Sequence, residues 1–335
     1  MHTTKIAGVG HYVPENIVKN ADLEMIMETS DAWIQERTGI KERRWVPQDS
    51  DDTPSVMGTK AARKAIADAG LEVTDIDFIV FATLSPDYYF PGPGVMVQEQ
   101  LGLPEIGALD VRNQCSGFIY GLSVADQFIK TGMYKNILLI GSELHSGGLD
   151  KTTRGRGVSV IFGDGAGAVV LSRAQEGEGK IHTTKLHSEG KHAKELALLG
   201  PSTTNWVDAM IEAQDPEDLS YYPYMNGNFV FKHAVTRFQE VIHEALAELD
   251  KKPEDIDLLI PHQANLRISQ FIQQKMGLRN DQVFNNIQKY GNTTAASIPI
   301  ALSEAKAEGR IKPGQLLCLA AFGSGFTWGS SLIQF

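Results

Sequence analysis

The stretch Asn113-Gln114-Cys115-Ser116-Gly117-Phe118 decides how the chain is interpreted. An apolar run typical of a strand precedes it at residues 106–111, and an apolar segment with helical spacing follows at residues 118–129. A cysteine at such a strand-to-helix corner lies near the unpaired N–H groups of the first helical turn, and these favour a thiolate. Cys115 is therefore a candidate nucleophile, although a small residue before a glycine is equally typical of plain helix–strand packing.

The other cysteine, Cys318, lies inside the apolar run at residues 316–321, which favours a buried and inert thiol. Two cysteines without a CxxC spacing argue against a disulfide framework or a structural zinc site. We therefore expect a reducing, cytoplasmic location.

Length and composition indicate an ordinary soluble globular protein. A chain of 335 residues with 42% hydrophobic content is long enough for two domains. No apolar run approaches the roughly 20 residues that span a bilayer, and the N-terminus lacks the apolar region of a signal peptide. The net charge of −10 argues against general nucleic-acid binding but leaves room for a local basic patch.

Segments with strand-like and helix-like patterns alternate along the chain, which predicts an α/β fold. We expect strands at residues 6–10, 76–83, 106–111 and 136–141, helices at residues 21–29, 53–69, 95–101 and 118–129, and a tight turn at residues 163–168 between two apolar runs.

The second half of the chain repeats this order. Residues 61–83 align without a gap on residues 241–263, a shift of 180, and residues 130–135 resemble residues 308–312 with a shift of 177. These matches predict a duplicated domain with halves at residues 1–174 and 175–335. A shift of 177 places Cys115 on Asn292, so we expect these two residues to approach a common point across a pseudo-twofold axis.

Three polar motifs in the second half carry candidate site residues. His262 follows a predicted buried strand, Asn292 stands at a predicted helix start, and Ser324 lies in the glycine-rich loop Phe322-Gly323-Ser324-Gly325. Taken one at a time, each has an equally typical structural explanation. His262 could be a core histidine, Asn292 a helix N-cap, and the loop around Ser324 a simple turn. Together with Cys115 they supply a nucleophile, two hydrogen-bonding side chains and a loop of free N–H groups.

Five motifs together resemble the β-ketoacyl-acyl-carrier-protein synthase III family of the thiolase superfamily. They lie at residues 113–118, 163–168, 261–268, 291–297 and 325–329, and the resemblance runs from residue 6 to residue 335. It implies a duplicated thiolase-like fold with five layers, α-β-α-β-α, and two mixed sheets. It also implies an acyltransferase that initiates fatty-acid synthesis.

The resemblance implies a role for each catalytic residue. Cys115 would take an acyl group from acyl-CoA as a thioester. His262 and Asn292 would hydrogen-bond the thioester of malonyl-acyl carrier protein during decarboxylative Claisen condensation, giving 3-oxoacyl-acyl carrier protein, CO2 and CoA. The backbone N–H groups of Cys115 and Ser324 would form the oxyanion hole. No metal or redox cofactor is implied, and the sequence offers no convincing metal site.

The resemblance also implies binding residues. Trp33 with Arg156 would sandwich the CoA adenine, and Arg37 would bind CoA phosphates; the plain alternative is a partly buried tryptophan with solvated arginines. Phe90 would close the acyl pocket of the neighbouring subunit in a homodimer. The candidate docking patch for the acidic carrier protein consists of Lys232, Arg267 and Lys275, which could equally form a solvated helix face.

Three departures from the family pattern concern the acyl group. They are Asn113-Gln114 before the nucleophile, residues 85–94 around the dimer-contributed pocket, and the long segment at residues 201–224, which is of a kind that often covers substrates. We therefore hypothesise a primer longer than acetyl. Two hypotheses compete with a synthase that initiates fatty-acid synthesis. The first is a related condensing enzyme or acyltransferase of secondary metabolism, with a longer acyl donor or a different acceptor. The second is a catalytically silent acyl-binding partner of another synthase. A silent partner is expected to have lost one of the three catalytic side chains.

Overall fold

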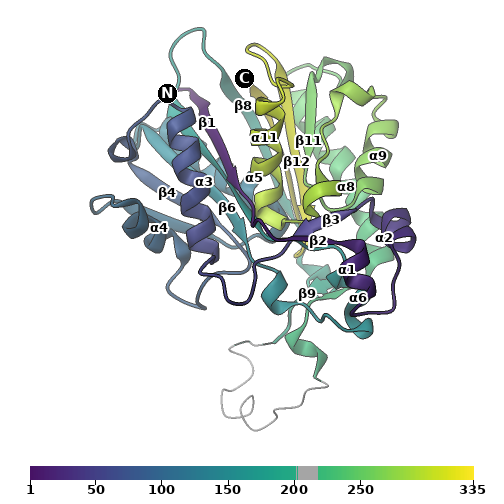
Figure 1. Cartoon of the computed structure of the whole chain (residues 1–335). Coiled ribbons are helices and arrows are strands. Elements are labelled where there is room, and N and C mark those ends of the chain that lie inside the picture. The colour runs from purple at the N-terminus through teal and green to yellow at the C-terminus, as the bar shows by residue number, and fades with distance from the viewer. Residues whose placement is uncertain (201, 203–217) are drawn as a thin grey trace.

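Two large β-sheets with helices between and outside them form the body of the protein (Figure 1), and two short two-stranded sheets accompany them. The computed structural model describes residues 1–200, 202 and 218–335. The first sheet has the strand order β1 (Thr4–Tyr12), β7 (Gly165–Arg173), β6 (Asn136–Glu143), β4 (Phe78–Ala82) and β5 (Gly107–Val111). The second has the order β11 (Leu258–Pro261), β12 (Leu316–Gly323), β13 (Thr327–Gln334) and β8 (Lys180–Ser188).

Six helices complete five layers. α3 (Pro54–Asp68) and α4 (Pro93–Leu101) pack on the outer face of the first sheet, and α8 (Gly227–Glu248) and α9 (Leu266–Lys275) pack on the outer side of the second. α5 (Gly117–Lys130) and α11 (Ser297–Ala307) lie between the sheets and share one core with both. The expected α-β-α-β-α order is confirmed, and Figure 1 shows α5 and α11 in the middle of the molecule, with α3 and α4 on the side of the first sheet and α8 and α9 on the side of the second.

The remaining short elements surround the end of the sheets where the glycine-rich loop lies. They are β2 (Ile17–Lys19), α1 (Asn20–Glu24), α2 (Asp31–Thr38), β3 (Glu42–Arg44), α6 (Arg156–Ser159), β9 (Leu196–Ala197), β10 (Tyr224–Met225) and α10 (Ile287–Tyr290).

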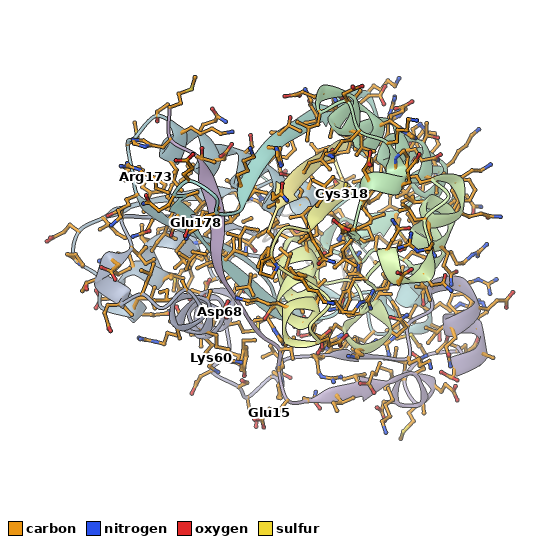
Figure 2. The ribbon with its side chains drawn as sticks, turned by 90° about the horizontal axis from the view of Figure 1, so that it is seen from above. Glu15, Lys60, Asp68, Arg173, Glu178 and Cys318 are labelled. Carbon is orange, nitrogen blue, oxygen red and sulfur yellow. The ribbon has the colours of Figure 1, made fainter. Side chains whose placement is uncertain are left out.

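The two sheets repeat one pairing pattern. β4 pairs with β6 in parallel, as β11 does with β12, and the next two pairings are antiparallel in both sheets. β6 begins at residue 136 and β12 at residue 316, an offset of 180. The duplication inferred from the sequence therefore appears as two similar βα layers. The proposed boundary between residues 174 and 175 stays a prediction; it falls in the link from β7 to β8, where Figure 2 labels Arg173 and Glu178.

The repeat register at the nucleophile differs from the expected one. α5 begins at Gly117 and α11 at Ser297, an offset of 180, whereas their ends at Lys130 and Ala307 are offset by 177 because α11 is three residues shorter. The repeat counterpart of Cys115 is therefore Ala295, and the expectation that it is Asn292 is wrong.

Two local predictions also need correction. The helix expected at residues 21–29 ends at Glu24, where the chain enters a turn in which the N–H groups of Ile26 and Met27 both donate to the Leu23 carbonyl. The turn buries Met27 and leaves Met25 85% exposed. The turn expected at residues 163–168 is shorter, since β7 already begins at Gly165. A Cβ atom at Gly167 would lie 2.6 Å from the backbone nitrogen of Ile300, so this glycine allows α11 to approach the sheet.

Other predictions are confirmed. Thr53 caps α3, which covers the predicted helix at residues 53–69, and the strands expected at residues 6–10, 76–83, 106–111 and 136–141 are present. Cys318 is fully buried in β12 (Figure 2), and burial raises the pKa of its thiol to about 12. Most of the segment at residues 201–224 lies outside the described residues, so its role as a substrate cover stays a prediction.

Candidate active site

Cys115 stands on a sharp turn between β5 and α5. Gln114 has φ 42°, in the left-handed region, and the hydroxyl of Ser116 donates to the Asn113 carbonyl at 3.0 Å. The facing residue is Gly323, at the end of β12, where a Cβ atom would lie 2.5 Å from the Cβ of Cys115 and 3.0 Å from its Sγ. The glycine therefore leaves the space that the sulfur occupies.

The thiol of Cys115 is protonated at neutral pH. Burial raises its pKa to about 12, and the nearby carboxyl of Glu143 adds to this. Hydrogen bonds from the backbone N–H groups of Ser324 and Cys115 lower the pKa but do not outweigh burial. The expectation of a stabilised thiolate is therefore wrong, because the helix start lies in the interior, where desolvation of the anion dominates. The two N–H groups nevertheless converge on the sulfur, where the resemblance implies an oxyanion hole.

His262 directly follows β11 and is 3% exposed. Its Nδ1 lies 2.7 Å from the Ser297 hydroxyl, which also accepts the backbone N–H of Gln263 at 3.4 Å. This arrangement favours a hydroxyl proton directed at Nδ1 and a ring proton on Nε2. Burial, together with nearby His145, lowers the pKa of His262 to about 3, so the ring is neutral. Nε2 is buried without a partner among the described residues.

Asn292 is held by both its backbone and its side chain. Its backbone N–H donates to the Ile161 carbonyl at 2.8 Å, and its carbonyl accepts from the N–H of Gly163 at 3.1 Å. Its Oδ1 accepts the N–H of Thr294 at 2.8 Å, which leaves the amide group Nδ2 as the free donor. Asn292 was expected at a helix start; it instead lies between α10 and the turn that leads into α11.

These side chains face one pocket of about 330 Å3, which is lined by Cys115, His262 and Asn292 at one end and by Trp33 and Arg37 at the other. The sequence prediction that the three polar residues meet is therefore confirmed. A second cavity of about 310 Å3 also reaches Cys115; its lining includes Leu84, Gln114, His145, Phe162, Leu198 and Ser324. Two cavities thus open on one sulfur.

The predicted CoA-binding residues form a cluster at the pocket entrance. The guanidinium carbon of Arg37 lies 4.4 Å from the centre of the Trp33 ring, and that of Arg156 lies 5.4 Å from it. Two van der Waals contacts need roughly 7 Å. The gap between Trp33 and Arg156 is therefore too narrow for an adenine ring unless a side chain moves.

The other predicted binding residues lie outside the catalytic pocket or at its rim. Phe90 is 81% exposed and does not line the two cavities at Cys115. Arg267, at the start of α9, lines the pocket, and its guanidinium lies over Phe231 at 5.9 Å. Lys232 follows Phe231 on α8, and Lys275 lies at the other end of α9.

Several residues that support the site were not singled out from the sequence. Ser297 orients His262, Thr294 orients Asn292, and Gly323 makes room for Cys115. Glu143 is fully buried and accepts hydrogen bonds from the N–H groups of Leu84, Ser85 and Ala295 and from two hydroxyls. Ser297 and Thr294 belong to a quoted motif, but only their neighbours in space reveal what they hold.

Within the described ranges, no group of three or more His, Cys, Asp or Glu side chains could hold a metal ion. Among the residues that the structure describes, no helix is long and apolar enough to cross a bilayer.

The duplicated five-layered fold, with Cys, His and Asn side chains around one pocket, defines a condensing enzyme of the thiolase superfamily, an acyltransferase. Family models described as 3-oxoacyl-[acyl-carrier-protein (ACP)] synthase III and its C-terminal part match residues 109–190 and 246–335. The chain belongs to the 3-oxoacyl-[acyl-carrier-protein] synthase III family.

Individual relatives agree over nearly the whole length. The β-ketoacyl-[acyl-carrier-protein] synthase III of Aliivibrio fischeri is 45% identical over 332 residues, 99% of either chain. The crystal structure of the Aquifex aeolicus enzyme has 43% identity and a TM-score of 0.90, covering 99% of this chain and 100% of that one. The Thermus thermophilus structure has 36% identity and a TM-score of 0.90, covering 99% of both chains. These relatives do not favour the alternative of a secondary-metabolism enzyme.

Proposed function

We propose that the protein catalyses the priming condensation of fatty-acid biosynthesis, with acyl-CoA and malonyl-acyl carrier protein as substrates. The observation that carries the proposal is the pairing of Cys115 with two buried hydrogen-bond donors, Nε2 of His262 and Nδ2 of Asn292, in one pocket. Both donors have their other polar atom occupied, so they are oriented before a substrate arrives.

The first half-reaction would be acyl transfer. The sulfur of Cys115 attacks the thioester carbonyl of acyl-CoA, a new carbon–sulfur bond forms, and CoA leaves with the proton that Cys115 gives up. Because the resting thiol has a pKa of about 12, its deprotonation would accompany the attack rather than precede it. The backbone N–H groups of Cys115 and Ser324 would stabilise the tetrahedral oxyanion.

The second half-reaction would be decarboxylative condensation. The donors of His262 and Asn292 bind the malonyl thioester oxygen, so the electron pair released when CO2 leaves is held as an enolate. That carbon attacks the acyl carbonyl on Cys115, and the carbon–sulfur bond breaks, which leaves 3-oxoacyl-acyl carrier protein. The departing cysteine sulfur takes up one proton from solvent and returns to the resting thiol. Because burial lowers the pKa of His262 to about 3, its ring is neutral at pH 7. The N–H of a neutral imidazole is a very weak acid, so it would stabilise the enolate by a hydrogen bond without protonating it.

The electron pair released with CO2 stays within the substrate, so the reaction needs no external oxidant or reductant, and we infer that no cofactor is needed besides the substrates. The exposed guanidinium-rich entrance around Trp33 would bind CoA. Lys232, Arg267 and Lys275 would guide the acidic carrier protein on a chain whose net charge is −10. A cytoplasmic location agrees with these substrates.

A homodimer is part of the proposal. Tyr88, Tyr89 and Phe90 form an exposed aromatic group, with 59%, 62% and 81% of their surface accessible. Such a group is typical of a surface that a partner covers. In the dimer, Phe90 of each subunit would reach the acyl pocket of the other.

We further propose that the primer is longer than acetyl. The second cavity at Cys115, of about 310 Å3, is lined in part by the apolar side chains of Leu84, Phe162 and Leu198, which could contact an alkyl chain. An acetyl group would place a single methyl there.

The test is intact-protein mass measured after incubation with a series of acyl-CoAs, beside Cys115→Ala. We expect an acyl adduct on the native protein only, with the highest occupancy for a primer longer than acetyl. Release of CO2 from malonyl-acyl carrier protein then follows condensation, and His262→Ala and Asn292→Ala should each lower it about 10²–10³-fold while leaving the adduct intact. An equal adduct on the alanine variant would remove Cys115 from the mechanism.

A further inference from the structure

Two side chains that must act on one substrate oxygen come from different parts of the fold. His262 ends β11 in the second sheet, whereas Asn292 follows the short helix α10. The distance between their donors therefore depends on the backbone bonds that hold Asn292 to Ile161 and Gly163, and on what ties α10 to the end of β11.

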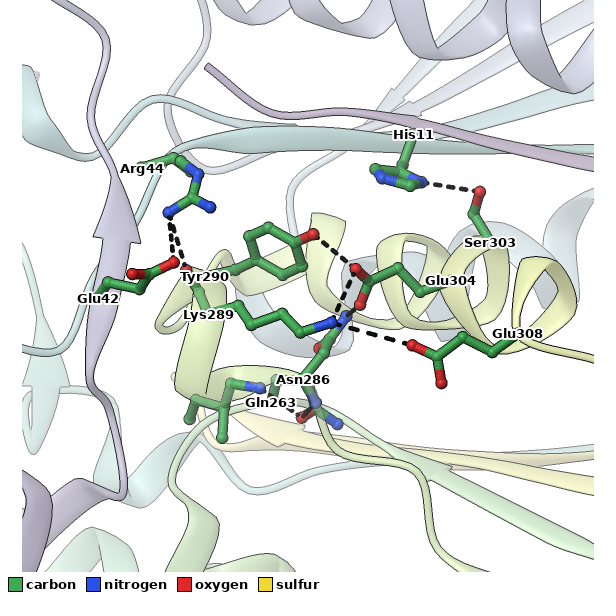
Figure 3. A network of polar contacts seen from close by, with 11 residues as sticks. His11, Glu42, Arg44, Gln263, Asn286, Lys289, Tyr290, Ser303, Glu304 and Glu308 are labelled. Atoms are coloured by element: carbon green, nitrogen blue, oxygen red, sulfur yellow. Dashed lines mark hydrogen bonds and ion pairs between the residues drawn. The ribbon is translucent and has the colours of Figure 1, made fainter. Parts of the chain in front are cut away.

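Gln263 makes that tie. It follows His262 directly and is 3% exposed, and its side chain contacts the start of α10 (Figure 3). Its Oε1 accepts the backbone N–H groups of Asn286 at 3.0 Å and Ile287 at 3.2 Å. Its Nε2 donates to the carbonyls of Pro261 at 2.7 Å and Phe284 at 3.4 Å. The buried amide thus has a partner for each of its two donors and two for its acceptor.

The same residue also contacts the support of His262. The backbone N–H of Gln263 donates at 3.4 Å to the Ser297 hydroxyl, the group that holds Nδ1 of His262 at 2.7 Å. One residue therefore touches the supports of both donors, through its backbone on one side and its side chain on the other.

α10 transmits its position to Asn292 with little freedom. Asn286 and Tyr290 both donate to Glu304 of α11, at 2.9 Å and 2.6 Å, as Figure 3 shows. Gly291 then donates to the Ile287 carbonyl at 2.9 Å, and Asn292 follows. A shift of Ile287 would consequently move Asn292 relative to His262.

We propose that Gln263 is a positioning residue that sets the spacing between His262 and Asn292 for the condensation half-reaction. The inference rests on the proposed function. Replacing the amide by an apolar side chain would leave the buried N–H groups of Asn286 and Ile287 unpaired, and the loop would have to move to satisfy them. A misplacement of about 1 Å in a catalytic constellation costs on the order of 10²-fold in rate.

The acyl-transfer half-reaction should escape this effect. Cys115 lies on the turn before α5, and Ser324 directly follows β12. The hydrogen bonds of the Gln263 side chain go to neither place. The structure therefore separates a condensation defect from an acylation defect.

The experiment compares Gln263→Met with the matched control Gln282→Met. Gln282 is also 3% exposed and also bridges backbone groups, the Ile256 carbonyl at 2.6 Å and the Arg279 N–H at 3.0 Å, but away from α10. We expect Gln263→Met to acylate Cys115 within about twofold of the native rate and to release CO2 from malonyl-acyl carrier protein roughly 10²-fold more slowly. Gln282→Met should retain both rates.

A double variant tests whether Gln263 acts through Asn292. Gln263→Met combined with Asn292→Ala should be no slower in condensation than Asn292→Ala alone. If Gln263→Met does not fold, Gln263→Glu carries the same test, since its carboxylate keeps the acceptor for Asn286 and Ile287 and loses the donor to Pro261. It should show a smaller condensation defect.

Condensation at the native rate in Gln263→Met and Gln263→Glu would overturn the inference. So would equal losses of both half-reactions matched by a comparable loss in Gln282→Met, which would indicate general loosening. A native protein that acylates Cys115 but releases no CO2, or accepts no acyl group, would refute the proposed function itself and the inference with it.

Discussion

Gly323→Ala is the substitution whose consequence is most directly fixed by the structure. The added Cβ would lie 2.5 Å from the Cβ of Cys115, 3.0 Å from its Sγ and 3.1 Å from its backbone nitrogen. Comfortable carbon–carbon contacts are about 3.5–4.0 Å. The Cβ and the backbone nitrogen of Cys115 belong to the turn before α5 and cannot swing away, although the Sγ could rotate about the Cα–Cβ bond.

Two effects set the magnitude. Overpacking of a close-packed interior costs about 1–3 kcal/mol of stability. Separation of Cys115 from the neighbouring N–H of Ser324 would also weaken the proposed oxyanion hole, and loss of one such donor costs roughly 10²–10³-fold in rate. We therefore expect Gly323→Ala to fold with reduced stability and to acylate Cys115 at least 10²-fold more slowly.

The assay is the rate of adduct formation by intact mass, with thermal unfolding measured in parallel. The matched control is Gly190→Ala, where no heavy atom lies within 4 Å of the added Cβ. Gly190→Ala should keep the native acylation rate. A Gly323→Ala protein that acylates within twofold of the native rate would refute the argument that Gly323 makes the space for the sulfur.

Three further predictions follow from charge and stacking. Alkylation of Cys115 by iodoacetamide should rise about tenfold per pH unit up to pH 10, since burial raises the pKa of its thiol to about 12; a plateau by pH 9 would contradict this. Burial raises the pKa of Glu143 to about 7 from its ordinary 4.5, so the folded state binds the proton more tightly than the unfolded state. The free energy of unfolding should therefore fall by about 3 kcal/mol as pH rises from 4.5 through 7. Urea unfolding should show that slope in the native protein and not in Glu143→Gln. Trp33→Ala should raise KM for acyl-CoA about 2- to 30-fold with little change in kcat, the loss of a contact worth about 0.5–2 kcal/mol; an unchanged KM would exclude stacking.

Sequence reasoning recovers the order of elements because each carries its own periodicity. The helix at residues 53–69 has a capping Thr53 and an apolar face, and the strand predicted at residues 76–83 contains the uninterrupted apolar run Phe78–Ala82. The chain around residues 21–29 shows the limit. Its apolar residues suit a helix, but only tertiary contacts decide that Met25 and Ile26 remain at the surface.

The sequence predicts which three polar residues line the pocket, but it does not predict the protonation state of Cys115. Cys115, His262 and Asn292 stand in recognisable motifs, and they do line one pocket. The charge state of Cys115 depends instead on how deeply the helix start is buried and on Glu143, which is 28 residues away in sequence. A rule based on the helix N-terminus alone gives the wrong sign, because desolvation is a property of the folded environment.

The duplication explains why only one half carries the nucleophile. With the offset of 180, Gln114 at φ 42° corresponds to Thr294 at φ 49°, Cys115 to Ala295, and Glu143 to Gly323. At Cys115 the facing residue is Gly323, whose missing side chain leaves room for the sulfur. At Ala295 the facing residue is Glu143, whose carboxylate accepts the Ala295 N–H at 3.4 Å and fills the corresponding space. The N–H that could serve an oxyanion in one half is thus consumed as a structural donor in the other, which instead carries His262 and Asn292, the two donors that we propose for the second substrate.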